Sequence, residues 1–134
     1  MFVTDAATVL CWVIPGTMTP DAARALQRSR NTLLIVPSLW LWETHNALLK
    51  LVRQRKLVPE DATNARIAIS LIPRRVDAMV DQLQVDRTWE IATTQMMTIY
   101  DATYVELALR LNLPIASDDT AIRNAARHLG LVLV

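Results

Sequence analysis

The chain has 134 residues, of which 52% are hydrophobic, and its formal net charge is +1. This composition is typical of a folded domain and excludes a disordered chain. Only two glycines are present, which excludes glycine-rich phosphate loops of the Walker or dinucleotide-binding type, so we expect no nucleotide cofactor. The single cysteine, Cys11, cannot form an internal disulfide and lacks the partners of a zinc site, so we expect it to be a buried apolar side chain.

The first residues resemble neither a targeting signal nor a membrane span. They contain no basic stretch, and Asp5 interrupts an apolar run that is shorter than the roughly 18 residues a transmembrane helix needs. We therefore expect a cytoplasmic protein, without a membrane partner, whose residues 1–134 form one domain.

Helix signals and short apolar runs alternate in the first half of the chain. Thr19 supplies a cap, Pro20 a first-turn proline and Asp21 an early acid. Ser38 is placed to cap a long helix, and Pro59 opens another. These signals predict, in order, a strand at residues 2–5, a helix at 7–14, a helix at 20–30, a strand at 33–36, a helix at 38–55 and a helix at 59–71.

The second half of the chain continues the alternation. Thr98 and Asp101 have the spacing of a capping box, and either Asp118 or Asp119 can cap the last helix. The pattern predicts a strand at residues 74–79, a helix at 80–96, a helix at 98–111, a strand at 113–117, a helix ending near 128 and a strand at 131–134. Short apolar strands that alternate with helices indicate an α/β fold with a parallel sheet covered on both faces.

Five carboxylates end or interrupt apolar segments, namely Asp5, Glu43, Asp101, Asp118 and Asp119. Ligands of parallel sheets bind beyond the carboxyl ends of the strands, where the first acid and the adjacent pair are expected. A cluster of negative charge is costly without compensation, and carboxylate oxygens suit a hard cation such as Mg²⁺. The joint pattern therefore predicts a metal site.

Each acid also has a structural alternative. Asp101 could simply complete the cap with Thr98, one of the late pair could be an N-cap, and Asp119 could pair with Arg123. Glu43 is the most informative acid because no cation lies three or four residues away from it.

A polar stripe follows Glu43 along its helix. Asn46 and Lys50 share its face, while Leu49 lies on the side expected to face the core. Lys50 also begins a basic cluster within seven residues that contains no acid. Its members, which favour either a phosphate backbone or a solvated helix end, are Lys50, Arg53, Arg55 and Lys56.

The acids lie in four sequence blocks, VTDAATVLCWVI, VPSLWLWETHNALL, IYDATYVELALRL and PIASDDTAIRNAARHLGL. In this order and spacing the blocks resemble those of the PIN domain, particularly the VapC-type toxins of bacterial and archaeal toxin–antitoxin pairs. The resemblance implies a three-layer α/β/α sandwich with a central parallel sheet of about four to five strands. It also implies a Mg²⁺- or Mn²⁺-dependent endoribonuclease that hydrolyses RNA phosphodiesters with a metal-activated water.

The resemblance assigns the catalytic acids by position. Asp5 matches the first acid, Glu43 the second in a Glu-x-x-Asn pattern that Asn46 completes, and Asp101 the third in Tyr-Asp-Ala. It implies that one or two ions are held by Asp5, Asp101 and Asp119, with Glu43 contributing directly or through water. The number of ions stays open.

The fourth block departs from the family pattern. Asp119 occupies the usual acidic position and Ser117 that of a small hydroxyl residue, so Asp118 is an additional acid. Either aspartate could be the ligand, and we favour Asp119. Ala6 stands where many relatives carry a serine, which leaves the surroundings of the metal open.

The implied partners are an RNA substrate, a small cognate antitoxin and a second copy of the chain in a homodimer. Trp12, Trp40 and Trp42 lie in apolar segments and are expected in the core, so nothing indicates which RNA is cut or at which sequence. His45 and His128 are not expected to be catalytic.

The rival functions fit less well. A receiver-type module resembles a pattern with a late lysine, but no lysine follows Lys56, and a phosphatase with a nucleophilic aspartate commonly has a second aspartate where Ala7 stands. The stronger alternative is a catalytically inert PIN-like RNA-binding or scaffold subunit.

Overall fold

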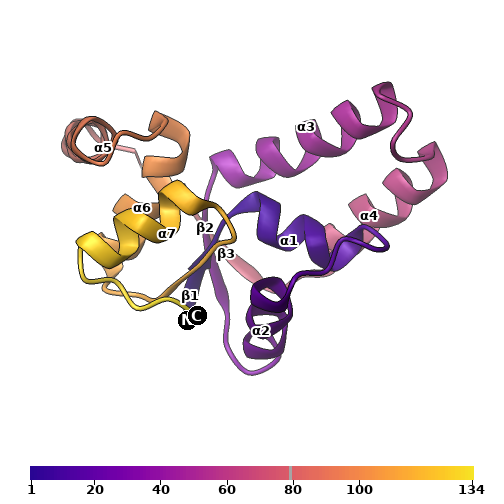
Figure 1. Cartoon of the computed structure of the whole chain (residues 1–134), viewed down its shortest axis with the longest axis horizontal. Helices are drawn as coiled ribbons and strands as arrows, with labels where there is room; N and C mark the ends of the chain where they lie inside the picture. Colours follow the sequence, from indigo (N-terminus) through magenta and orange to yellow (C-terminus); the bar gives the residue numbers. More distant parts are fainter. Residues whose placement is uncertain (79) are drawn as a thin grey trace.

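The fold is a four-stranded parallel sheet between two layers of helices (Figure 1). We describe it from a computed structural model that covers residues 1–78 and 80–134. The strand order is β3-β2-β1-β4, so β1 is central. The strands are β1 (Phe2–Thr4), β2 (Leu34–Pro37), β3 (Arg74–Asp77) and β4 (Ile115–Ala116).

Helices cover both faces of the sheet. On one side lie α1 (Ala6–Val13), α2 (Pro20–Ser29), α3 (Leu39–Arg53) and α4 (Pro59–Leu71). On the other side lie α5 (Gln82–Thr94), α6 (Ile99–Leu111) and α7 (Thr120–His128). The three-layer sandwich predicted from the sequence is therefore confirmed.

Three of the strands, β1, β2 and β4, are short apolar runs whose side chains form the centre of the core, whereas the edge strand β3 is polar and partly exposed. Val3 of β1 lies opposite Ile35 of β2 and Ile115 of β4, and all three are fully buried. Strands that are buried on both faces read as continuous apolar sequence without alternation, as β1, β2 and β4 do. The register aligns the carboxyl ends of β1 and β4, so the residues after them meet at one edge of the sheet.

Three sequence signals were misread at the ends of elements. Residues 131–134 form only one bridge, between Leu133 and Ile115, instead of a strand. Ser38 occupies the N-cap position of α3 in a helical conformation, and its side chain makes no capping bond. A capping box that we did not predict joins Asp81 and Gln84 at the start of α5. Residue 79, the end of a predicted strand, lies outside the described residues.

Two apolar side chains of α3 that were expected in the core face solvent. Trp42 is 76% exposed and Leu49 is 46% exposed, whereas Trp40 is fully buried. Residues two apart on a helix point about 200° apart, so a buried Trp40 directs Trp42 outward. The expectation for Trp42 was therefore wrong.

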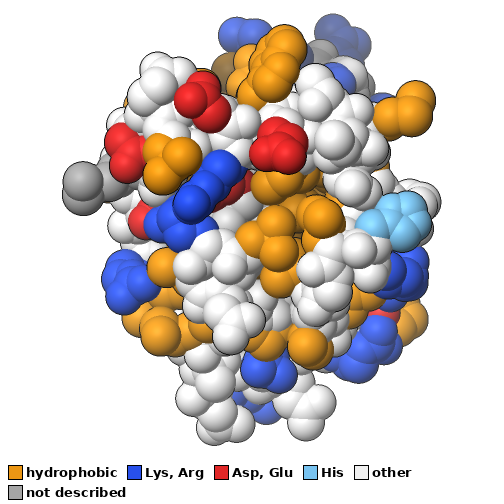
Figure 2. All heavy atoms as spheres, turned by 90° about the vertical axis from the view of Figure 1, so that its left-hand side faces the viewer, with side chains coloured by type: hydrophobic (Ala, Val, Ile, Leu, Met, Phe, Trp, Pro, Cys, Tyr) orange, Lys and Arg blue, Asp and Glu red, His pale blue; other side chains and the backbone are white. Residues whose placement is uncertain are grey.

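The face formed by α5, α6 and α7 also exposes apolar side chains. Figure 2 shows them near the centre of this face, bordered by charges of both signs. A hollow of about 390 Å³ on it is lined in part by Ile91, Leu109 and Leu129. None of the five predicted acids lines this hollow. Within the described residues, no helix is long and apolar enough to cross a bilayer.

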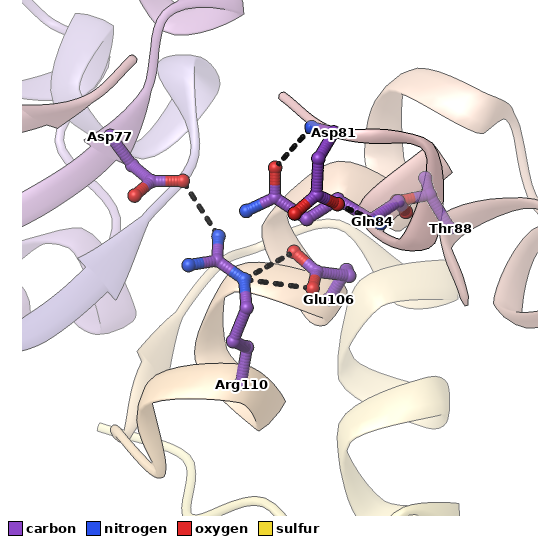
Figure 3. A network of polar contacts seen from close by, with 6 residues as sticks. All are labelled: Asp77, Asp81, Gln84, Thr88, Glu106 and Arg110. Carbon is purple, nitrogen blue, oxygen red and sulfur yellow. Dashed lines mark hydrogen bonds and ion pairs between the residues drawn. The ribbon is translucent and has the colours of Figure 1, made fainter. Parts of the chain in front are cut away.

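Arg110 ties α6 to the end of β3 (Figure 3). Its Nη2 donates to Asp77 Oδ2 at 2.6 Å, and its Nε donates to both carboxylate oxygens of Glu106 at 2.9 and 3.2 Å. Glu106 is only 5% exposed. A carboxylate this deeply buried depends on its cation for solvation.

Arg110→Met is expected to lower the free energy of unfolding by about 2 kcal/mol, because it leaves the buried Glu106 carboxylate unpaired. We place the cost below that of a fully buried pair, since the Arg110 side chain is 22% exposed. Urea unfolding measures it, with Arg127→Met as the matched control, because Arg127 is exposed and bonds only its helical neighbour Asn124 among the described residues. Equal stability of the two variants would contradict the role of Arg110.

Candidate active site

One cavity of about 350 Å³ brings together acids from four distant segments of the chain. It lies beyond the carboxyl ends of β1 and β4, between α3 and the first turns of α1, α6 and α7. Its polar lining consists of Asp5, Glu43, Asn46, Lys50, Asp101, Tyr104 and Asp119. The structure thus places the polar stripe of α3 and four of the five predicted acids around the same space.

Asp5 is the most buried of the acids, with 4% of its surface exposed. It follows β1 and caps α1, because its Oδ1 accepts a hydrogen bond from the Thr8 backbone N at 2.8 Å. Its Oδ2 accepts a hydrogen bond from the Ser117 hydroxyl. Burial raises the pKa of the Asp5 carboxyl above its ordinary value, the bonds from Ser117 and Thr8 oppose this, and the charge of Asp119 adds to it.

Glu43 projects from α3 and accepts a hydrogen bond from the Tyr104 hydroxyl of α6. Burial raises the pKa of Glu43, the Tyr104 bond opposes the rise, and the charges of Asp101 and Asp5 add to it. The pKa values of Asp5 and Glu43 are raised for the same main reason, which is burial of the carboxyl groups. Burial and like charges make the cavity a costly place for a negative charge, and a cation would relieve that cost.

Asp101 lies in the first turn of α6 on the face that also carries Tyr104. Its backbone N donates to the Thr98 hydroxyl at 3.1 Å, and its Oδ2 accepts from the same hydroxyl at 2.8 Å. The predicted cap of α6 by Thr98 is therefore confirmed. The returning bond of a capping box is replaced by a contact between the two side chains.

The adjacent aspartates point in different directions. Asp119 lines the cavity and caps α7, accepting from Ile122 N at 3.0 Å. Asp118 does not line the cavity, and its Oδ2 accepts from the Thr19 hydroxyl at 2.5 Å, at the start of α2. The pairing of Asp119 with Arg123, considered as a structural alternative, is absent from the described residues, where Arg123 contacts Asp21 at 2.7 Å.

Ser117 links the first and fourth acids. Its hydroxyl donates to Asp5 Oδ2 and accepts from the Asp119 backbone N at 3.0 Å. The side chain is buried, with 3% of its surface exposed. Ser117 therefore connects the residues that follow β1 and β4.

The basic cluster divides between the cavity and the far end of α3. Lys50 lines the cavity, while Arg53, Arg55 and Lys56 are exposed near the carboxyl end of the helix and are not part of its wall. Neither His45 nor His128 lines the cavity either.

The donor set fits a hydrated magnesium-like ion better than a cation held in a closed protein cage. Within the described residues, no three side chains of the types that ligate metals stand close enough to hold one ion. Mg²⁺ keeps several waters and commonly takes only one or two carboxylates directly. Acids spaced around a roomy cavity, two of them with raised pKa values, match that mode of binding.

Tyr104 is a residue of the site that the sequence reasoning missed. Burial, followed by the bond to Glu43, raises the pKa of its hydroxyl above the ordinary value, so the hydroxyl stays protonated as a donor. The one available signal was its place three residues after Asp101, on the same helical face. Its partner, Glu43, lies 61 positions away in the sequence.

Tyr104→Phe is expected to weaken Mn²⁺ binding about tenfold, because Glu43 loses the donor that orients it. Calorimetric titration of the folded variant measures the affinity. Tyr100→Phe is the matched control, since Tyr100 is 58% exposed and its hydroxyl makes no hydrogen bond among the described residues. Identical Mn²⁺ affinities for Tyr104→Phe and the parent would contradict the positioning role.

Solved structures share the fold over nearly the whole chain. PAE2754 from Pyrobaculum aerophilum superposes with a TM-score of 0.71 at 19% identity, covering 99% of this chain and 83% of that one. The Mycobacterium tuberculosis toxin VapC20, described as cleaving the sarcin-ricin loop, gives 0.66 at 19% identity over 100% and 98%. VapBC2 from Rickettsia felis, bound to a promoter DNA fragment, gives 0.64 at 12% identity over 100% and 98%.

Sequence comparison gives the family. A comparison with curated protein sequences finds no match. The family model of the PIN domain matches residues 7–128, which include Glu43, Asp101 and Asp119 together with their helices. The chain therefore belongs to the PIN domain family, as the four acidic blocks indicated.

Proposed function

We propose that the protein is a divalent-metal-dependent endoribonuclease and the toxin of a type II toxin–antitoxin pair. One observation carries the proposal: Asp5, Glu43, Asp101 and Asp119, from four distant segments, line a single cavity. Membership of the PIN family and the likeness in fold to VapC20 and VapBC2 support it.

The acids would divide the binding of Mg²⁺ or Mn²⁺ between them. Asp5, Asp101 and Asp119 are the proposed ligands of one or two ions, with some of these contacts made through coordinated water, and Glu43, held by Tyr104, contributes directly or through water. Asn46 lines the same cavity, and Ser117, which does not line it, would position two of the acids through its bonds to Asp5 and to the Asp119 backbone. When bound, a divalent ion lowers the pKa of a coordinated water and offsets charge on the scissile phosphate.

The wall of the cavity also provides a contact for the RNA backbone. Lys50 is exposed and stands on the same wall as Glu43 and Asn46, so its ammonium can approach a phosphate that enters the cavity. Such contacts weaken steeply with added salt. Arg53, Arg55 and Lys56 would extend this attraction beyond the cavity along the RNA strand.

The partners in the proposal are RNA, a small cognate antitoxin and a second copy of the chain. The solved structures of VapBC2 and of a toxin–antitoxin complex from Klebsiella pneumoniae, which share the fold, support an antitoxin partner. We place the protein in the cytoplasm, where its RNA substrates are found.

The test is an RNA cleavage assay on mixed single-stranded RNA with Mg²⁺, with EDTA, and with the Asp101→Asn variant in Mg²⁺. We expect cleavage only by the parent protein with metal. Cleavage that survives both chelation and substitution would overturn the proposal. An inert RNA-binding subunit would instead bind RNA, cut none under any condition, and lose no Mn²⁺ site in Asp101→Asn.

A further inference from the structure

A second hollow adjoins the acidic cavity. It has a volume of about 350 Å³ and is lined by Leu39, Trp42, Glu43, Asn46 and Tyr100. Glu43 and Asn46 also line the acidic cavity, so the two spaces share a wall. The two spaces therefore adjoin the same part of α3.

Two large aromatic side chains flank the hollow from different helices. Trp42 of α3 is 76% exposed and Tyr100 at the start of α6 is 58% exposed. Among the described residues, neither the Trp42 indole nor the Tyr100 hydroxyl makes a hydrogen bond to protein. Folding buries little of either ring, so their faces are free to contact a ligand.

The chemistry of the hollow suits an uncharged planar group with polar edges. Aromatic rings stack on nucleobases, and the Asn46 amide can both donate to and accept from a base edge. A phosphate is a poor occupant, because Glu43 would repel it and no basic side chain lines this hollow. A base, which carries no charge, avoids that repulsion.

We propose that the Trp42–Tyr100 hollow binds the nucleobase of the nucleotide next to the scissile phosphate and so sets which RNA sequence is cut. The part of this inference that concerns cleavage rests on the proposed ribonuclease function. It adds a base-reading site to the carboxylates, which act on the backbone alone. Because Glu43 and Asn46 line both spaces, a phosphate in the cavity and a base in the hollow would both contact this wall and can belong to adjacent nucleotides.

The first test measures RNA binding without metal, so that it does not depend on cleavage. A labelled single-stranded RNA is titrated in EDTA with the parent, Trp42→Ala, Tyr100→Ala and the control Trp89→Ala. Trp89 is 66% exposed on α5 and lines neither space. We expect a Kd about tenfold higher for the two hollow variants and an unchanged Kd for the control. Trp42→Phe, which keeps a stacking ring, should retain more affinity than Trp42→Ala.

The second test uses cleavage with Mg²⁺. Trp42→Ala should raise KM about tenfold with little change in kcat, and it should broaden the set of bases found beside the cut. For the parent protein, a substrate that lacks the base at that nucleotide should raise KM as much as Trp42→Ala does with the intact substrate. Trp42→Ala tested with the abasic substrate should have a KM no higher than either change gives alone, since both changes remove the same contact.

The outcomes separate this inference from the proposed function. If the parent cleaves RNA while Trp42→Ala and Tyr100→Ala keep the parental Kd, KM and cut sites, the base site is wrong and the ribonuclease stands. If the parent cuts nothing but binds RNA through Trp42 in EDTA, the base site stands and the ribonuclease fails. A change in oligomeric mass or in antitoxin binding for Trp42→Ala, with the Kd for RNA unaltered, would make the hollow a protein interface and overturn the inference.

Discussion

Asp5→Asn is expected to lower the rate of RNA cleavage about a thousandfold while leaving the protein folded. Asparagine keeps the shape of the side chain, and its Oδ1 can still accept the Thr8 N–H that caps α1. The substitution removes one negative charge from the cavity and with it a proposed ligand of the metal. A single-turnover cleavage assay at saturating Mg²⁺ measures the effect.

The same variant is expected to be more stable than the parent at neutral pH when metal is absent. Burial raises the pKa of Asp5 in the folded protein above the ordinary value of 3.8. As the pH rises above about 4, the carboxyl ionises first in the unfolded chain, so the parent loses stability until the folded pKa is passed. Asparagine does not titrate, so the gain should be smallest at pH 3.5 and should grow as the pH rises toward neutral.

Urea unfolding in EDTA across this pH range measures the gain. Asp86→Asn is the matched control, because Asp86 is exposed on α5. The difference in stability between this variant and the parent should not change with pH in the same way. Adding Mg²⁺ should raise the melting temperature of the parent and leave Asp5→Asn unchanged. A variant that is less stable than the parent at neutral pH would show that the buried charge of Asp5 is not a cost to the fold.

The sequence was sufficient to predict that acids would gather at one edge of the sheet. Asp5 and Asp119 follow parallel strands, and the carboxyl ends of adjacent parallel strands meet in space. Helical periodicity placed Glu43 with them, since Asn46 and Lys50 share its face and no cation lies three or four residues away to pair with it. Helical periodicity is a local property and the meeting of parallel strand ends is a topological one, and both can be inferred from the sequence.

Tyr104 and Trp42 could not be predicted in the same way. The role of the Tyr104 hydroxyl depends on its hydrogen bond to Glu43, which is 61 residues away. No local sequence pattern predicts such a contact. Trp42 sits in the run LWLW, where uniform hydrophobicity hides which of two tryptophans faces inward. Only the packing of α3, which fully buries Trp40, decides that question.

The terminal apolar segment shows a further limit. Residues 131–134 have the composition of a strand, yet only Leu133 pairs with β4. β4 itself spans two residues, so it offers a short edge to which a fifth strand could add. Strand propensity depends on the available partner as well as on the residue types.

The two adjacent aspartates are expected to differ sharply in function. Asp119→Asn should lower cleavage at least a hundredfold and weaken Mn²⁺ binding, because Asp119 lines the cavity. Asp118→Asn should stay within about threefold of the parent, because its carboxylate bonds Thr19 outside the cavity. Cleavage rates and calorimetric Mn²⁺ titrations of the two variants, measured side by side, test the difference.

Comparing the stabilities of these two variants shows whether a loss of activity comes from a loss of folding. Asparagine caps helices about as well as aspartate does, so Asp119→Asn should preserve the bond to Ile122 N and the start of α7. Asp118→Asn exchanges a charged acceptor of the Thr19 hydroxyl for a neutral one and should cost about 1 kcal/mol of stability. The variant with the larger loss of stability is thus expected to keep its activity. The reverse ranking in activity would transfer the role of fourth ligand to Asp118 and require the loop between β4 and α7 to turn toward the cavity when metal binds.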